Sequence, residues 1–408
     1  MGFNKKITQD EARRCPQCAT ATCLPGCPLG IDIPGFIRFL REGDATSALE
    51  RIKKENPFPA ICGRVCPAPC EQSCVFEAEG EPISIRALER FASDFGQSPK
   101  GTFSKTPTSA LGKKVAIIGS GPAGMTAAYY LAKAGLGVSI LEAAHEPGGM
   151  LRYGIPEFRL PQKVLDEQFA QLKALGVEVQ TDVIFNQTMR LDEILMRGFA
   201  TLLLATGQSL PRFSDLPGSS LGGVYYDTEF LNRLQAIQKE DVAQSAKRQD
   251  MPVSKTVVIG SGSAAFDAAR VSARLGHHVQ VIFEGLEEQA GVDQEILKET
   301  AEEGIEIHPL QALEIVGDGQ DFVQGVKCRK LDIIESEDGL RLVPSSEEPV
   351  VLEAATVVIA NGRQSQDLLK HIPSTSQDKV FTCGGDSVVE AMAHGKTTAQ
   401  KIIQYLNS

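Results

Sequence analysis

The sequence predicts an α/β protein in which two Rossmann-like folds follow an α-helical segment that is rich in cysteine. Two observations carry this prediction. A strand, a glycine turn, a helix and a second strand occur in that order twice, and the two copies are about 141 residues apart. Eight of the ten cysteines lie between residues 15 and 74, in two groups of four.

The first part of the chain is predicted to be helical. Three segments place their apolar side chains at helical spacing: residues 33–40, 45–54 and 85–95. The stretch rich in Pro, Gly, Ser and Thr that follows has the composition of a linker. We expect three domains: a helical domain at 1–105, a first nucleotide fold at 112–250 plus 360–408, and a second, inserted one at 251–359.

The cysteine spacing indicates a metal site. The first group has the spacing C-x2-C-x4-C-x3-C-P, and in the second group three residues separate successive cysteines. The first spacing is close to the C-x2-C-x2-C-x3-C-P run that holds iron–sulfur clusters. Iron–sulfur ligation is therefore the leading interpretation of these thiols: Cys15, Cys18, Cys23, Cys27, Cys62, Cys66, Cys70 and Cys74.

Other interpretations of the cysteines are weaker. Two structural zinc sites are an alternative because four thiolates suit zinc, although zinc ribbons usually pair two C-x2-C units. A thioredoxin-like pair of Cys15 and Cys18 is disfavoured because it opens no βαβ unit. A disulfide framework is disfavoured because residues 1–20 contain no apolar signal core, which predicts a cytoplasmic protein. The net charge of −11 and the lack of a long apolar run predict no nucleic-acid surface and no membrane insertion.

The first strand–turn–helix unit predicts a dinucleotide site, because a pyrophosphate needs backbone N–H groups and a helix N-terminus at close range. Gly119 would make the tight turn, and Gly121 would let the backbone approach the phosphates. Gly124 would let the helix pack on the strand. Glu142, at the end of the next strand, would accept hydrogen bonds from ribose hydroxyls.

The second unit repeats the pattern with Gly260 and Gly262, and it has Ala265 at the third position. Its second strand ends at Glu284, and no arginine follows directly. A carboxylate there would bond a free 2′-hydroxyl and repel a 2′-phosphate, which favours NADH over NADPH. The alternative is that Glu284 is a solvated strand end.

Longer motifs carry a resemblance to a known family. They are Cys-Pro-Leu-Gly30, Cys62-Gly-Arg-Val-Cys-Pro-Ala-Pro-Cys70, Leu88-Glu-Arg-Phe91, Gly119-Ser-Gly-Pro-Ala-Gly124, Pro147-Gly-Gly149, Arg152-Tyr-Gly-Ile-Pro-Glu-Phe-Arg-Leu-Pro161, Ala205-Thr-Gly207 and Gly384-Gly-Asp386. Through them the whole chain resembles the glutamate synthase small subunit, the N-terminal half of dihydropyrimidine dehydrogenase and the large subunit of NADH-dependent ferredoxin:NADP oxidoreductase. In length and domain set it looks most like the stand-alone small subunit of a bacterial dihydropyrimidine dehydrogenase.

The resemblance implies FAD in the first nucleotide fold, NAD(P)H in the second and two [4Fe–4S] clusters in the helical segment. It implies no catalytic side chain. Together with the glycine turns, it gives these predicted cofactor-binding residues: Gly119, Gly121, Pro122, Ala123, Gly124, Glu142, Gly148, Gly149, Arg152, Ala205, Thr206, Gly207, Gly260, Gly262, Ser263, Ala264, Glu284, Gly362, Gly385 and Asp386.

The resemblance also implies crossed ligation of the clusters. One cluster would be held by Cys15, Cys18, Cys23 and Cys74. The other would be held by Cys27, Cys66, Cys70 and Glu89, so that Cys62 is a spare thiol. The spacing alone leaves a simpler scheme open, in which each group of four cysteines holds one cluster.

The chain departs from the family pattern in three places. Phe283-Glu284-Gly285 replaces the paired arginines that would bind a 2′-phosphate, which puts NADPH in doubt. Arg86 stands near Glu89 where a glycine is usual. Asn361 replaces a hydrophobic residue before Gly362.

These features suggest an electron-input subunit of a heteromeric oxidoreductase, of the glutamate synthase or dihydropyrimidine dehydrogenase type. Electrons would pass between NAD(P)H, with NADH favoured, FAD, the two clusters and a partner subunit or ferredoxin-type carrier. One alternative is a ferredoxin-linked NAD(H) oxidoreductase, with or without electron bifurcation. Another is an electron-transfer scaffold that binds no nicotinamide.

Five more residues have predicted places: one near the flavin, two in the core and two at the surface. A helix that starts near Ser387 would direct its positive end at the flavin. Cys328 and Cys383 are single thiols and are predicted to be buried, which disfavours a disulfide reductase. His394 and Lys396 are predicted to be surface residues.

Overall fold

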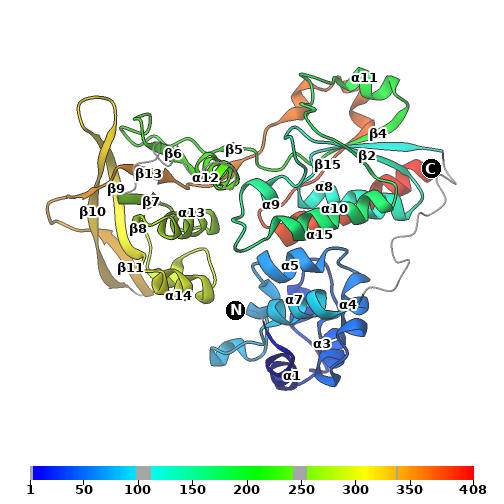
Figure 1. Cartoon of the computed structure of the whole chain (residues 1–408), viewed down its shortest axis with the longest axis horizontal. Helices are drawn as coiled ribbons and strands as arrows, with labels where there is room; N and C mark the ends of the chain where they lie inside the picture. The colour runs from blue at the N-terminus through cyan, green and yellow to red at the C-terminus, as the bar shows by residue number, and fades with distance from the viewer. Residues whose placement is uncertain (1–2, 98–111, 242–254, 337–338) are drawn as a thin grey trace. The chain divides into compact units, whose positions relative to one another are not determined.

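A computed structural model describes residues 3–97, 112–241, 255–336 and 339–408. The chain divides into two compact units (Figure 1). Unit 1 comprises Met1–Arg152, Glu157–Gly207 and Gln366–Ser408, and unit 2 comprises Tyr153–Pro156 and Gln208–Ser365.

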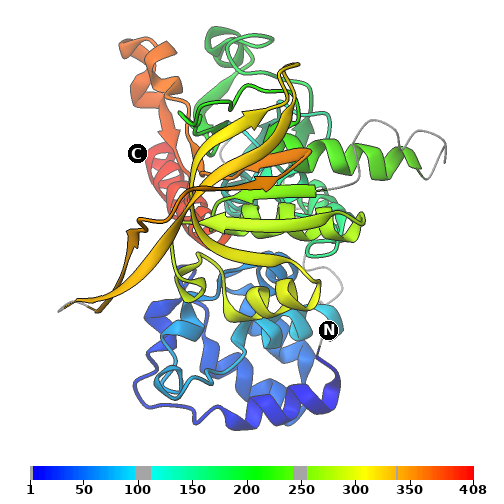
Figure 2. The same ribbon diagram turned by 90° about the vertical axis from the view of Figure 1, so that its left-hand side faces the viewer.

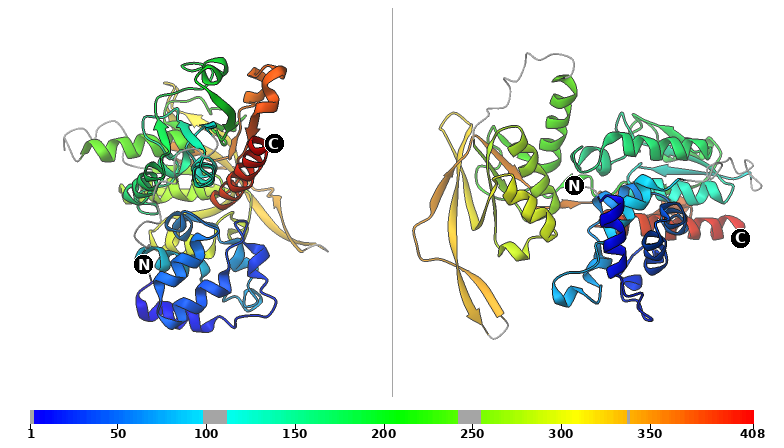
Figure 3. Two further views of the ribbon diagram at one scale, coloured as in Figure 1. Left: turned by 90° about the vertical axis from the view of Figure 1, so that its right-hand side faces the viewer. Right: turned by 60° about the horizontal axis from the view of Figure 1, so that its bottom comes forward.

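The N-terminal part of unit 1 is helical, as predicted (blue in Figure 3). Side chains cap three of its helices: Asn4, Asp32 and Asp44 accept from backbone N–H groups in the first turns of α1, α3 and α4. The three predicted helices are confirmed as α3, α4 and α7. The elements are α1 (Lys5–Arg14), α2 (Cys23–Gly26), α3 (Ile33–Glu42), α4 (Ala45–Lys53), α5 (Pro59–Val65), α6 (Pro69–Gln72), the 3₁₀ turn η1 (Glu77–Glu79) and α7 (Ile85–Phe95).

The rest of unit 1 is a parallel α/β fold with the strand order β15-β4-β1-β2-β3. Alternate residues of β1 face opposite sides of the sheet, and Ala116 and Ile118 pack with Ile194 of α11. The strands are β1 (Lys114–Ile118), β2 (Gly137–Leu141), β3 (Glu178–Gln180), β4 (Phe199–Leu204) and β15 (Val380–Thr382). The helices are α8 (Pro122–Lys133), α9 (Met150–Tyr153), α10 (Gln162–Ala174), α11 (Leu191–Met196), η3 (Leu368–His371), η4 (Ser374–Lys379) and α15 (Val388–Asn407).

Unit 2 contains the second nucleotide fold, on a mixed sheet with the order β11-β10-β9-β8-β7-β13-β6 in the described residues. Figure 2 shows its long strands β9 and β10. The strands are β5 (Leu210–Pro211), β6 (Val224–Tyr226), β7 (Lys255–Ile259), β8 (His278–Phe283), β9 (Glu306–Gly317), β10 (Val323–Ser336), β11 (Gly339–Pro344), β12 (Val350–Glu353), β13 (Thr356–Ile359) and β14 (Arg363–Gln364). The helices are α12 (Asp227–Asp241), α13 (Ser263–Arg274), η2 (Glu287–Gln289) and α14 (Gln294–Glu302).

The α/β class with two Rossmann-like folds is thus confirmed. Phe230, Leu231 and Leu234 of α12 lie in the same hydrophobic core as α13 of the second fold. Part of 208–250, which we predicted to belong to the first fold, therefore packs with the second. The three-domain division itself stays a prediction. Among the described residues, no helix combines the length and the hydropathy that crossing a membrane requires.

Candidate cofactor and electron-transfer sites

The first glycine turn follows β1 and has the geometry that a pyrophosphate needs. Gly119 has φ +101°, and a Cβ atom there would lie 2.5 Å from the carbonyl oxygen of Ala205. A Cβ on Gly124 would lie 2.1 Å from the carbonyl oxygen of Gly119, whereas one on Gly121 would meet no heavy atom within 4 Å. Gly119 and Gly124 thus serve the turn and the packing of α8, and Gly121 faces open space.

The helices after the two glycine turns begin without a capping side chain. Gly121 is the N-cap of α8, Gly262 is the N-cap of α13, and neither helix start receives a side-chain hydrogen bond. By contrast, Asp293 and Ser387 cap α14 and α15 with their side chains. The first N–H groups of α8 and α13 can therefore bind an anion. Pro122, Ala123, Ser263 and Ala264 lie in these first turns.

Glu142 is buried and firmly oriented. The backbone N–H of Ser120 donates to its Oε2 atom at 2.9 Å, and the Ser120 hydroxyl donates to the same oxygen. The N–H of Ala144 donates to Oε1 at 2.9 Å. The Ser120 hydroxyl in turn accepts from Gly148 N–H at 2.7 Å. Ser120, which the sequence analysis missed, ties the predicted ribose ligand to the glycine turn.

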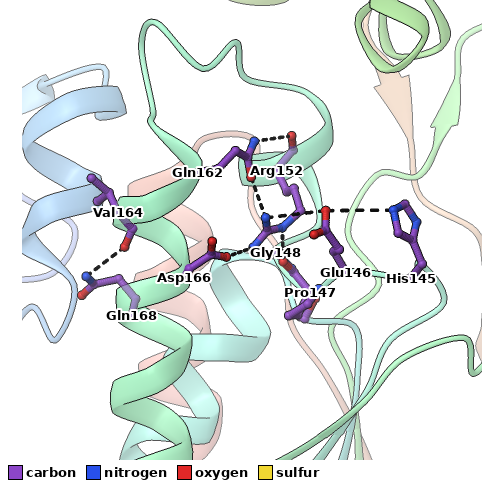
Figure 4. A network of polar contacts seen from close by, with 10 residues as sticks. His145, Glu146, Pro147, Gly148, Arg152, Gln162, Val164, Asp166 and Gln168 are labelled. Carbon is purple, nitrogen blue, oxygen red and sulfur yellow. Dashed lines mark hydrogen bonds and ion pairs between the residues drawn. The ribbon is translucent and has the colours of Figure 1, made fainter. Parts of the chain in front are cut away.

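Arg152 fastens the loop that contains Gly148 and Gly149 to helix α10 (Figure 4). Its Nε donates to the carbonyl oxygen of Pro147 at 2.6 Å, Nη1 to Gln162 Oε1 at 2.6 Å and Nη2 to Asp166 Oδ1 at 2.5 Å. A Cβ on Gly149 would lie 3.0 Å from the Cα of Gly121, so this loop passes close to the glycine turn. The contacts give Arg152 a positioning function, and its contact with a cofactor stays a prediction.

Two further motifs lie at the C-terminal ends of β4 and β15. Ala205, Thr206 and Gly207 follow β4 directly. Gly385 and Asp386 precede α15, and a Cβ on Gly385 would lie 2.5 Å from the backbone N of Ala391. Ser387 caps α15 in a capping box with Glu390, which confirms the predicted helix start.

The second glycine turn follows β7 in unit 2. Gly260 has φ +143°, and a Cβ there would lie 2.5 Å from the carbonyl oxygen of Ala360; a Cβ on Gly262 would meet nothing within 4 Å. Gly291, which the sequence analysis missed, donates its N–H to the carbonyl oxygen of Ser261 at 2.9 Å. Gly291 corresponds in the internal repeat to Gly149, so the repeat spacing could have identified it.

Glu284 is exposed at the end of β8, unlike Glu142 at the end of β2. Gln311 of β9 donates from Nε2 to Glu284 Oε2 at 3.3 Å. Gly362, after β13, has φ +84°. The carboxylate of Glu284 is therefore accessible to a ligand.

Four cysteines from the two sequence groups line one cavity: Cys15, Cys18, Cys23 and Cys74. Burial raises the pKa of Cys23 to about 11, with smaller contributions from the nearby thiolates of Cys15, Cys74 and Cys18. The first group thus meets the last cysteine of the second group. We name these four residues the outer thiol set.

The second set comprises Cys27, Cys66, Cys70 and Glu89, and we name it the inner set. Burial raises the pKa of Cys66 to about 12, with further contributions from Glu89 and Cys27. Burial also raises the pKa of Cys70, and the negative charges of Cys66, Glu71, Cys27 and Glu89 add to the effect. These effects indicate that the four residues of the inner set lie near one another, and that Cys62, whose pKa Glu89, Cys66 and Cys27 also raise, lies near them.

Glu89 is a buried carboxylate on α7. Burial raises its pKa to about 8, against the lowering effect of a hydrogen bond from Asn56. Asn56 Nδ2 donates to Glu89 Oε1 at 2.8 Å, and Asn56 Oδ1 accepts from Phe58 N–H at 2.9 Å. A buried carboxylate beside two buried thiols and one partly buried thiol fits a positively charged metal centre, because such a centre would take the place of the protons.

Cys62 is buried on α5, and its thiol contacts the Met392 sulfur of α15 at 3.5 Å. The neighbouring charges of Glu89 and Cys66 contribute to its raised pKa, so Cys62 is close to the inner set. The contact with Met392 nevertheless gives the thiol a partner in the α/β fold.

Among the described residues, no three His, Cys, Asp or Glu side chains are placed to hold one metal ion. Tetrahedral zinc, about 2.3 Å from each sulfur, would bring the sulfurs to within about 3.8 Å of one another. The outer thiols line a cavity instead. Sulfurs around a space suit a cluster of several irons better than a single ion.

The prediction that Lys396 is a surface residue is wrong. Its ammonium group donates to the carbonyl oxygen of Leu29 at 3.1 Å and forms an ion pair with Glu55. Both partners belong to the helical segment, whereas Lys396 lies on α15, so the contact could not be read from local sequence. His394 is exposed, as predicted, and its Nδ1 contacts the carbonyl oxygen of Gly384 at 2.8 Å.

Cys328 and Cys383 are free and buried, as predicted. Burial raises the pKa of each to about 12. Cys328 lies in the core of unit 2, and Cys383 follows β15 in unit 1. Both thiols are therefore protonated at neutral pH and unreactive.

Two family models cover nearly all of the chain. Residues 1–100 match the dihydropyrimidine dehydrogenase domain II with a 4Fe-4S cluster, and residues 113–402 match the pyridine nucleotide-disulphide oxidoreductases. The chain belongs to the pyridine nucleotide-disulphide oxidoreductase family. At the level of the family, the prediction of an NAD(P)H-dependent FAD and iron–sulfur oxidoreductase is confirmed.

Curated relatives match the predicted family as well. A glutamate synthase [NADPH] small chain of Mycobacterium tuberculosis is 34% identical over 67% of this chain and 57% of its own length. The NAD-dependent dihydropyrimidine dehydrogenase subunit PreT of Escherichia coli K12 is 35% identical over 67% of this chain and 64% of its own length. The E. coli K12 glutamate synthase [NADPH] small chain is 29% identical over 99% of this chain and 92% of its own length. The match thus spans less than two thirds of the first two relatives.

Solved structures show the same fold. Mycobacterium tuberculosis FprA in complex with NADPH aligns with 72% of this chain and 84% of its own, with a TM-score of 0.57 and 19% identity. 2-Naphthoyl-CoA reductase aligns with 89% of this chain and 51% of its own, with a TM-score of 0.56 and 20% identity. At this identity the likeness concerns the fold alone.

Proposed function

We propose that this chain is the electron-input subunit of a heteromeric oxidoreductase. It would take electrons from NADH through FAD and two [4Fe–4S] clusters to a partner subunit. The observation that carries the proposal is the combination, in one chain, of two uncapped glycine-turn helices and a cavity lined by Cys15, Cys18, Cys23 and Cys74. The relatives that are named as subunits or small chains support the heteromeric part.

The residues of the first fold would bind and orient FAD. Backbone N–H groups at the start of α8 would hold the pyrophosphate, and Glu142, fixed by Ser120, would accept from the ribose. The positive N-terminus of α15 would stabilise negative charge on the flavin. When bound, the flavin accepts hydride from nicotinamide and releases electrons one at a time.

We propose crossed ligation of the two clusters, by the outer and inner sets. Support comes from the cavity that Cys15, Cys18, Cys23 and Cys74 line together, because it joins three cysteines of the first group to one of the second. The matching family model is described by a 4Fe-4S cluster, which favours iron over zinc. Each cluster would carry one electron at a time.

We propose NADH as the preferred nicotinamide. The names of the relatives divide, since the glutamate synthase small chains are named for NADPH and the dihydropyrimidine dehydrogenase subunit for NAD. Glu284 supports NADH because its carboxylate is exposed at the end of β8, where it would repel a 2′-phosphate.

The test is anaerobic purification with copurifying proteins retained, followed by iron, sulfide and flavin analysis and titration with NADH or NADPH. About eight irons and one FAD per chain, with flavin bleached by NADH, are expected. Bleaching by neither nucleotide would leave only an electron-transfer scaffold. Reduction of ferredoxin without a copurifying subunit would favour the ferredoxin-linked alternative.

A further inference from the structure

Arg86 lies close to the inner set. It is the second residue of α7, and Glu89 follows one turn later on the same side of the helix. The Arg86 Nη1 atom donates to the carbonyl oxygen of Cys66 at 3.1 Å, although the two residues are 20 positions apart. A permanent positive charge thus contacts the backbone of one proposed ligand, one helical turn from another.

A second contact, through the backbone, also fixes the position of Arg86. Its backbone N–H donates to Glu71 Oε1 at 2.7 Å, and Glu71 follows Cys70 directly on α6. The start of α7 has no capping side chain from its own N-cap residue, Ser84, so Glu71 supplies the acceptor from another helix. The segment from Cys66 to Glu71 is therefore bound to Arg86 at both ends.

The sulfur of Cys66 has one more electropositive neighbour. The backbone N–H of Ala68 donates to Cys66 Sγ at 3.3 Å, and Ala68 adopts φ +52°, which is unusual for a residue other than glycine. This hydrogen bond favours negative charge on the sulfur, and the positive charge of Arg86, which is bound to the carbonyl oxygen of the same residue, acts in the same direction.

We propose that Arg86 is a positioning residue that raises the reduction potential of the cluster held by the inner set. The inference rests on the proposed function, in which that cluster takes one electron from reduced flavin and passes one electron on. Adding the electron makes the site more negative by one charge. A fixed cation beside Cys66 stabilises this state more than the oxidised one, so it raises the midpoint potential.

The experiment uses the full chain with its clusters, poised anaerobically at set potentials and followed by electron paramagnetic resonance after iron and sulfide analysis. Arg86→Gln should keep the iron and lower one of the two midpoints. A tenfold change in the reduction equilibrium, which is about 59 mV for one electron, is the expected scale. Arg86→Lys should retain most of the wild-type midpoint because it keeps the charge.

Two further variants sharpen the test. Arg90→Gln removes the same charge from the same helix, but the Arg90 side chain is 43% exposed and its charge is screened by solvent, so little change is expected. Glu71→Gln removes the opposite charge beside Cys70 and should raise the same midpoint. Because the expected shift of the midpoint potential has the opposite sign, this variant also tests the electrostatic effect on the inner set if Arg86→Gln fails to retain iron.

The outcomes separate the two proposals. Unchanged midpoints in iron-loaded Arg86→Gln would overturn the inference about Arg86 and leave the proposed function intact. If Arg86→Gln and Arg86→Lys lose equal amounts of iron and Glu71→Gln does not raise the midpoint potential, Arg86 has only a structural role. That result would also overturn the inference about Arg86. A wild-type chain without iron would overturn the proposed function, and the inference with it.

Discussion

Replacement of Cys62 by alanine distinguishes the two ligation schemes. If the clusters are held by the outer and inner sets, Cys62 is no ligand, and Cys62→Ala should keep about eight irons per chain. If each sequence group of four cysteines holds its own cluster, the variant should lose about four. The contact of the thiol with Met392 at 3.5 Å is the structural reason to expect the first result.

The expected cost in stability is small. Cys62 is 1% exposed, so its removal leaves a cavity the size of one sulfur between α5 and α15. Loss of one buried heavy atom with its cavity costs about 1 to 1.5 kcal/mol. In a chain of this size that shifts the melting temperature by roughly 1–2 °C, so the variant should fold. Cys62→Ser would bury a hydroxyl beside a thioether and should cost about as much or more.

The assay is iron and acid-labile sulfide content per chain after anaerobic reconstitution, with protein quantified by amino-acid analysis. Cys70→Ala is the positive control, because both schemes make Cys70 a ligand and predict loss of about half the iron. Glu89→Ala should lose iron only under crossed ligation. The reasoning would be refuted if Cys62→Ala lost half its iron while Glu89→Ala kept all of it.

Three other predictions follow from the described contacts. Glu284→Arg combined with Glu287→Gln should raise the NADPH to NADH ratio of kcat/KM for flavin reduction about tenfold or more, and an unchanged ratio would remove Glu284 from the specificity argument. Lys396→Met loses the hydrogen bond to Leu29 and the partly exposed ion pair with Glu55, and it should lower the free energy of unfolding by about 1–2 kcal/mol. In stopped-flow measurements it should also slow the reduction of the clusters that follows flavin reduction. Lys401→Met on the same helix should have neither effect. Gly124→Ala should unfold more easily because its Cβ would lie 2.1 Å from a carbonyl oxygen, whereas Gly121→Ala should keep its stability without cofactor and lose FAD affinity; equal stabilities of the two apoproteins would contradict the packing argument.

Local sequence was sufficient for the features that local chemistry determines. The three predicted glycine roles at Gly119, Gly121 and Gly124 agree with the space around each Cα, because strand, turn and helix are adjacent in the chain. Helix starts such as Asp32 and Ser387 follow from capping chemistry. The repeat spacing also contained Gly291, which a complete comparison of the two copies would have found.

Contacts between distant segments could not be predicted in this way. Lys396 was assigned to the surface because nothing within a helical turn of it reveals Leu29, 367 positions away. The Met392 partner of Cys62 is 330 positions distant, and no pattern around either residue predicts it. Likewise, the spacing of eight cysteines allows both ligation schemes, and only the resemblance suggested the crossed one.

The contacts missed by sequence reasoning share one location, and this has a consequence for electron transfer. Lys396 and Met392 lie one turn apart on α15, whose N-terminus follows the predicted flavin ligand Asp386. Their partners lie beside the inner set: Leu29 follows Cys27 by two positions, and the carbonyl oxygen of Cys62 accepts from the N–H of Cys66. The same helix is thus attached at one end to the predicted flavin site and along its side to the inner set. Because transfer between redox centres depends steeply on their separation, we expect these attachments to affect the rate of the proposed electron transfer, although neither side chain is a predicted ligand.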